Sequence, residues 1–128
     1  MTMLQPILSP RLDMKKRRNR TRIIKSKVPV IGIVEWFRPG EYKRVEQVLS
    51  DIKSIGVNEL RTCISWADWH TPSAEAWYSW FLPKIASEVN VLPCFTYTPP
   101  SIGIAPKVSS PPVKAKDYAD FIDLMITR

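Results

Sequence analysis

The sequence predicts an α/β fold made of three consecutive βα units. Apolar, β-branched segments alternate with segments whose apolar residues have helical spacing. The expected strands cover residues 28–34, 57–65 and 89–97, and the expected helices cover residues 41–55, 74–88 and 118–126. Short connections in this order require parallel strands with right-handed crossovers, so we expect the strands to lie side by side in chain order.

The first unit begins with a strand that is apolar on both faces. Residues 28–34 are rich in valine and isoleucine, as in a parallel strand covered on both sides. Pro39 and Gly40 then break the chain, and Gly56 supplies a left-handed stop after the first helix. Between these breaks the apolar residues fall at the spacing of one helix face, which predicts the first helix; they are Val45, Val48, Leu49, Ile52 and Ile55.

The second and third units follow the same pattern. Residues of the second strand alternate between two faces: Leu60, Thr62 and Ile64 on one, and Arg61, Cys63 and Ser65 on the other. Ser73 can cap the second helix, and Pro83 should kink that helix or start a fresh turn. The third strand leads into residues 98–112, a loop rich in proline and serine that is long enough to form a rim or lid.

Aromatic, charged and hydroxyl side chains gather where each strand ends. They are Glu35, Trp36 and Phe37, then Arg61, Trp66, Asp68, Trp69 and His70, then Thr96 and Tyr97. A (β/α)8 TIM barrel builds its active face in this way, from the loops after its strands. A closed barrel needs eight strands and about 250 residues. We therefore expect residues 28–128 to form the first three βα units of a barrel, as a partial domain.

Most of the positive charge lies in the first 27 residues. The chain has a net charge of +7, but residues 1–27 hold nine bases and one acid, a net charge of +8. The remaining residues hold ten bases and eleven acids, a net charge of −1. Blocks of like charge repel each other, so we expect a disordered basic tail. The near-neutral remainder makes nucleic acid an unlikely partner, although the tail itself offers an alternative function in binding nucleic acid or an anionic surface.

Neither a membrane nor an exported location is indicated. Gln5 and Pro6 interrupt the apolar residues near the N-terminus, and no run approaches the roughly 20 apolar residues of a membrane span. Cys63 and Cys94 each lie inside an expected strand, where small buried thiols are common. We therefore expect a reduced, cytoplasmic protein with no membrane partner.

Arg61 is the sharpest individual signal for a binding site. A guanidinium in a buried strand needs a carboxylate or sugar hydroxyls to accept its hydrogen bonds. Glu35 follows the first strand and is either a ligand-binding carboxylate or the partner of Arg61. Asp68 and His70 lie after the second strand, where a lone histidine is more often structural than catalytic. One histidine and two separated cysteines do not give metal-ligand spacing, so we expect neither a metal nor a cofactor.

The tryptophans divide into two groups. Three tryptophans stand at strand ends, where indole rings can stack on sugar rings: Trp36, Trp66 and Trp69. Trp77 and Trp80 lie within a helix and are expected in the core. Packing explains the strand-end aromatics equally well.

Several stretches resemble a known enzyme family. "GVNELRTCISWADWHTPSAEAWYSWFLPKI" is similar to the second unit of the retaining TIM-barrel glycoside hydrolases, and "VLPCFTYTPPSIGI" and "YADFIDLMITR" are similar to the third. The resemblance implies that Arg61 orients the nucleophile and that Trp66, Asp68 and Tyr97 line the subsite for the scissile sugar. In this family the two catalytic carboxylates end strands four and seven, so no residue here receives either role.

These observations give a leading expectation and two alternatives. The leading one is an N-terminal fragment of a glycoside hydrolase-like protein that acts on O-glycosyl bonds, with a carbohydrate substrate and no activity on its own. The alternatives are tail-mediated binding and a noncatalytic carbohydrate-binding module. An open three-stranded sheet leaves edges unpaired, so we also expect self-association.

Overall fold

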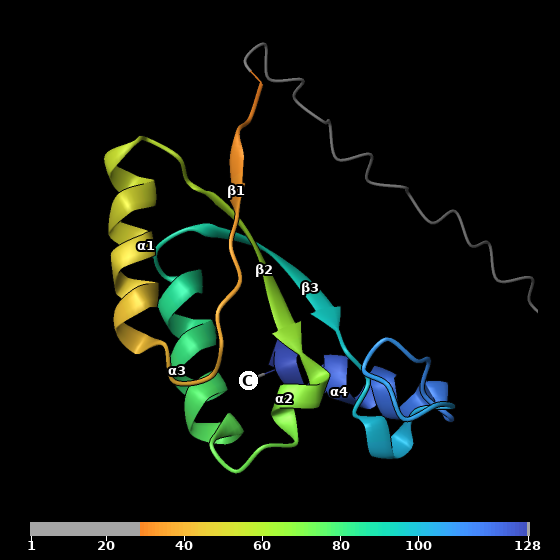
Figure 1. Cartoon of the computed structure of the whole chain (residues 1–128). Helices are drawn as coiled ribbons and strands as arrows, with labels where there is room; N and C mark the ends of the chain where they lie inside the picture. The colour runs from red at the N-terminus through yellow and green to blue at the C-terminus, as the bar shows by residue number, and fades with distance from the viewer. Residues whose placement is uncertain (1–28, 128) are drawn as a thin grey trace, which may run out of the picture.

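The computed structural model describes residues 29–127. The expected basic tail, residues 1–27, lies outside the described residues. The elements follow in the order β1 Gly32–Val34, α1 Tyr42–Ser54, β2 Glu59–Ser65, α2 Trp66–Trp69, α3 Ala74–Ala86, β3 Asn90–Thr96, a 3-10 turn Pro100–Ile102 and α4 Ala115–Thr127. Figure 1 shows the three strands running in one direction beside these helices.

The strands form one parallel sheet in the order β1-β2-β3. This confirms the predicted α/β class, the parallel pairing and the order of the strands. The register places Arg61 opposite Leu92, Cys63 opposite Cys94, and Ser65 opposite Thr96. Within the described residues β2 has two neighbours, whereas β1 and β3 have one each.

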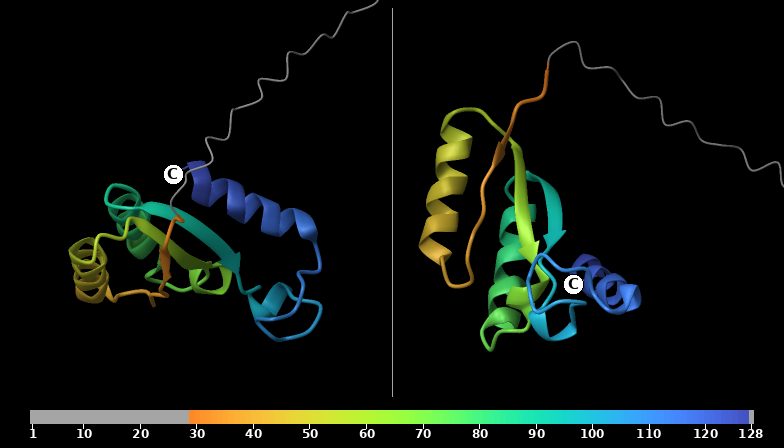
Figure 2. Two further views of the ribbon diagram at one scale, coloured as in Figure 1. Left: turned by 90° about the horizontal axis from the view of Figure 1, so that it is seen from above. Right: turned by 45° about the vertical axis from the view of Figure 1, so that its right-hand side comes forward.

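The three long helices pack on one face of this sheet (Figure 2). That face of β2 presents Leu60, Thr62 and Ile64, which are at most 3% exposed. The buried helical residues are Val45, Leu49 and Ile52 of α1, Trp77, Phe81 and Ile85 of α3, and Phe121 and Met125 of α4. Burying one large apolar side chain contributes about 1.5–3 kcal/mol, so this layer holds the fold together.

The opposite face of the sheet is open, which corrects one prediction. Residues 28–34 were expected to form a strand covered on both sides, yet β1 has three residues and Val34 is 58% exposed. Leu92 of β3 is 62% exposed. The described residues supply helices for one face and no helical layer for the other, although Cys63 and Ser65 on that other face are buried. Apolar residues on both faces of a segment predict a strand but do not show that both faces are covered.

Two details of α3 bear on the expectations for it. The helix is continuous from Ala74 to Ala86, so no fresh turn starts at Pro83, and Ser73 stands at the N-cap but makes no capping hydrogen bond with its side chain. A proline inside a helix costs about 3 kcal/mol. Phe81 and Ile85 on either side are each 1% exposed, and their burial offsets that cost. At the end of α1, Gly56 adopts the left-handed φ of 74° that the sequence predicts.

Within residues 29–127 no helix combines the length and apolar character that crossing a membrane requires.

The open face leads to a first prediction. Leu92→Lys should shift the chain toward the monomer, because a charge on an exposed apolar sheet face opposes association of two such faces. Sedimentation velocity over a range of concentrations measures the distribution. Ile126→Lys, on the exposed side of α4, is the matched control and should leave the distribution unchanged. If Leu92→Lys also leaves the distribution unchanged, the prediction is contradicted.

Candidate functional site

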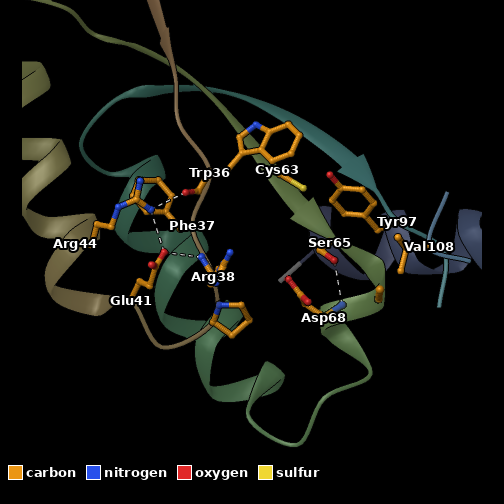
Figure 3. Close-up of a pocket in the computed structure, with 12 residues that line it drawn as sticks. Trp36, Phe37, Arg38, Glu41, Arg44, Cys63, Ser65, Asp68, Tyr97 and Val108 are labelled. Atoms are coloured by element: carbon orange, nitrogen blue, oxygen red, sulfur yellow. Dashed lines mark hydrogen bonds and ion pairs between the residues drawn. The ribbon is translucent and has the colours of Figure 1, made fainter. Parts of the chain in front are cut away.

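A cleft of about 720 Å³ opens at the carboxyl ends of the strands, on the side that the helices leave uncovered. Figure 3 shows side chains pointing into it from the segments that follow all three strands. Its lining comprises Trp36, Phe37, Arg38, Pro39, Glu41, Arg44, Cys63, Ser65, Ala67, Asp68, Tyr97 and Val108.

Arg44 of α1 fixes the wall that follows β1. One guanidinium nitrogen donates hydrogen bonds to the Trp36 carbonyl oxygen at 2.8 Å and to Glu41 Oε2 at 3.0 Å. The other nitrogen forms an ion pair with Glu35, and the guanidinium lies over the Phe37 ring. This network ties the backbone at Trp36 to the first turn of α1 and so orients the indole at the cleft.

Glu41 is committed to the same network. Its Oε2 accepts a hydrogen bond of 2.8 Å from the Arg38 backbone N–H. This bond, followed by the bond and charge of Arg44, lowers the pKa of Glu41 below its usual value. Glu41 is therefore ionised at neutral pH and serves to hold the loop.

Ser65 begins the wall that follows β2. Its Oγ accepts a hydrogen bond of 3.1 Å from the Asp68 backbone N–H and caps the short helix α2. Tyr78 of α3 holds the backbone at Ser65 from the helical layer. Its hydroxyl accepts a hydrogen bond of 3.0 Å from the Ser65 backbone N–H and donates one of 3.2 Å to the Ser65 carbonyl oxygen. The anchored turn directs the Asp68 carboxylate toward the cleft (Figure 3).

Tyr97 follows β3 in a strained conformation. Its φ of 64° is rare for a residue with a large side chain, and such strain is often found at functional sites. A hydrogen bond of 2.8 Å from the Ala67 N–H to the Tyr97 carbonyl holds the backbone there. The ring lies 6.2 Å from the Trp36 ring in an edge-to-face arrangement, and the two side chains are 38% and 50% exposed. Together they form an aromatic pair that spans the end of β2.

Three of the six predicted site residues line the cleft: Trp36, Asp68 and Tyr97. Glu35 is not among the lining residues and pairs with Arg44 instead of Arg61. Among the described residues it therefore takes neither of the two roles that the sequence left open.

Arg61 and Trp66 lie elsewhere. Arg61 is exposed on the open face, so the premise that its guanidinium is buried was wrong, and its Nε donates to Cys94 Sγ at 3.0 Å. Trp66 is 3% exposed and stacks on Phe121 with ring centres 5.8 Å apart. Arg61, Trp66 and Glu35 belong to the groups expected at the strand ends, and the contacts place them in three different surroundings.

Sequence reasoning missed several residues of the cleft. Arg38, Glu41 and Arg44 belong to the loop after β1 and the first turn of α1, where the helix pattern alone does not show which charges face a cleft. Ser65 was assigned to the correct face, but its role in capping α2 depends on a helix that the pattern did not predict.

The chain matches no protein-family model, and no curated protein or solved structure matches it either.

The anchor on Ser65 leads to a second prediction. Tyr78→Phe should lower the free energy of unfolding by about 1–3 kcal/mol, because two buried backbone groups lose the hydroxyl that they share. Urea unfolding followed by circular dichroism measures the change. Tyr42→Phe, at a ring 40% exposed, is the control and should shift stability by less than about 0.5 kcal/mol. Equal losses in the two variants would show that the Ser65 anchor is unimportant.

Proposed function

We propose that this cleft binds a carbohydrate, and that the chain is the N-terminal part of a glycoside hydrolase-like (β/α)8 barrel protein acting on O-glycosyl bonds. The observation that carries the proposal is the pairing of Trp36 and Tyr97 beside Asp68, at the carboxyl edge of three parallel strands. In barrel enzymes this edge carries the active site.

The aromatic pair supports a ligand with flat apolar faces. Trp36 and Tyr97 expose much of their rings, whereas Trp66 and Trp77 are buried, so packing in the described residues does not account for the exposed pair. Sugar rings offer apolar C–H faces that stack on such rings. A volume of about 720 Å³ falls within the range of about 300–1,000 Å³ that is usual for sites of small ligands.

The polar lining supports a ligand rich in hydroxyl groups. Asp68 accepts hydrogen bonds and Arg38 donates them, and they stand on opposite walls (Figure 3). Among residues 29–127 the observed ion pairs involve neither of these side chains. Hydroxyl groups donate to a carboxylate and accept from a guanidinium, so one sugar ring can satisfy both.

The same lining argues against hydrolysis by these residues. Retaining cleavage needs two carboxylates that flank the bond, one of them protonated at the start. Glu41 and Asp68 are the carboxylates that line the cleft, and Glu41 is held ionised by Arg38 and Arg44. We therefore assign binding to this part of the barrel and leave the acid/base and nucleophile to strands four and seven, as in the family that the sequence resembles.

Binding is tested with three probes: methyl β-galactoside, xylobiose and cellobiose. At least one should give saturation-transfer NMR signals with the full chain, and Trp36→Ala, Tyr97→Ala and Asp68→Asn should each weaken binding by about 10-fold, corresponding to the loss of about 1–1.5 kcal/mol from one stacking or hydrogen-bonding contact.

Leu92→Ala is the matched control, because it removes an exposed apolar side chain from the same open face away from the cleft lining. If Leu92→Ala weakens binding as much as Trp36→Ala does, the sugar adheres to the sheet in general and not to the cleft. Absence of signal with all three sugars would remove the support for a sugar site.

Hydrolysis is tested separately. The purified chain should not cleave aryl β-galactosides, β-xylosides or cellobiosides, because the described residues give the cleft no second carboxylate that is free to act. Release of nitrophenol measures turnover. Turnover that disappears in Asp68→Asn or Glu35→Gln would overturn the assignment of binding alone.

A further inference from the structure

Asp68 differs in its partners from Glu41, the other carboxylate of the cleft. Glu41 forms an ion pair with Arg44, whereas the ion pairs observed among residues 29–127 do not include Asp68. The Asp68 side chain lines the cavity and points toward it (Figure 3). The cleft therefore presents a carboxylate with room for a positively charged partner.

The positive charges of the opposite wall are already balanced. Arg44 shares its charge between Glu35 and Glu41, so one base and two acids leave a net charge of −1. The pKa of Glu41 is lowered first by the hydrogen bond from the Arg38 backbone N–H, and also by the charges of Arg44 and Arg38. The Arg38 guanidinium thus offsets the remaining −1. It can still donate hydrogen bonds to hydroxyl groups, but this wall adds no net positive charge.

The negative charge of the other wall is that of Asp68 itself. Burial raises the pKa of the Cys63 thiol, and the charge of Asp68 raises it further, so the thiol stays neutral at neutral pH. The Ser65 hydroxyl accepts from the Asp68 backbone N–H and leaves the carboxylate to a ligand. A ligand that carries one positive charge would neutralise this part of the cleft.

The aromatic pair favours the same kind of ligand. Trp36 and Tyr97 line the cleft with ring centres 6.2 Å apart and an interplanar angle of 77°. The faces of aromatic rings carry partial negative charge and attract a cation within about 6 Å, most strongly at tryptophan. A sugar hydroxyl gains little from this attraction. An ammonium group on the sugar ring is attracted both by the rings and by the Asp68 carboxylate.

We propose that the sugar bound in this cleft is a protonated amino sugar, whose ammonium group lies against Asp68 while its hydroxyl groups accept from Arg38. Asp68 is then the residue that selects an amino sugar over a neutral one. This inference rests on the proposed carbohydrate site and names the class of sugar that the site takes.

The test compares two disaccharides that differ in charge. Cellobiose is neutral, and its glucosamine counterpart carries an ammonium group in place of one hydroxyl on each ring. Affinities of the full chain are measured by NMR titration at about pH 6, where such an amine keeps its proton. The glucosamine disaccharide should bind about 10-fold more tightly, the combined effect of one exposed ion pair and one cation–π contact. Diacetylchitobiose, in which the nitrogen is acetylated and neutral, should lose this advantage.

Two variants locate the preference. Asp68→Asn keeps the shape of the side chain but removes its charge, so it should bind cellobiose and the glucosamine disaccharide with similar affinity. Asp123→Asn is the matched control, because it changes the net charge equally at an exposed position of α4 outside the cleft lining, and it should keep the full preference. Circular dichroism checks that both variants fold, and the preference of the unsubstituted chain is measured without either.

The possible results separate this inference from the sugar site on which it rests. Equal affinity of the unsubstituted chain for cellobiose and the glucosamine disaccharide would overturn the inference and leave the sugar site standing. A preference that Asp68→Asn retains, or that Asp123→Asn loses equally, would overturn the role of Asp68. Binding of neither disaccharide nor of diacetylchitobiose would overturn both proposals.

Discussion

The rest of the structure depends on the central strand, β2, and on the burial of one of its faces. Leu60, Thr62 and Ile64 are at most 3% exposed beneath the helices, and this requirement is strong enough to bury the Thr62 hydroxyl without a hydrogen-bond partner among the described residues. Leaving such a group unpaired costs about 1–3 kcal/mol. Burial of the two aliphatic neighbours contributes more than that, so the strand keeps this register.

Fixing one face of β2 fixes what the other face presents. Side chains alternate along a strand, so Arg61, Cys63 and Ser65 must project to the open side in that order. Ser65 ends the series where the strand turns into α2, and Tyr78 secures that turn from the helical layer. The core is therefore connected to the cleft by named contacts. Tyr78 of α3 hydrogen-bonds to the Ser65 backbone, and the Ser65 side chain hydrogen-bonds to the Asp68 backbone.

Sequence periodicity could predict the strands, the long helices and the parallel order, because burial imposes those patterns directly. It could also place Trp36, Asp68 and Tyr97 near one edge, since the carboxyl ends of parallel strands lie together. It could not place Arg61 or Trp66. Alternation assigned Arg61 to a face but could not show that this face is open. Trp66 is the residue directly after Ser65, the last residue of β2. Because α2 begins at Trp66, the chain turns there and the indole lies in the core.

The neighbourhood of Cys63 was hidden from sequence reasoning for a related reason. Spacing along the chain finds residues that share one helix or loop, whereas Cys63 and Cys94 meet through the register of two strands. Residues two apart on one face of a strand are separated by about 6.6 Å, so Cys63 lies about that distance from Ser65. Both side chains line the cleft, so the register that the buried face of β2 imposes also sets which side chains of β2 the cleft receives.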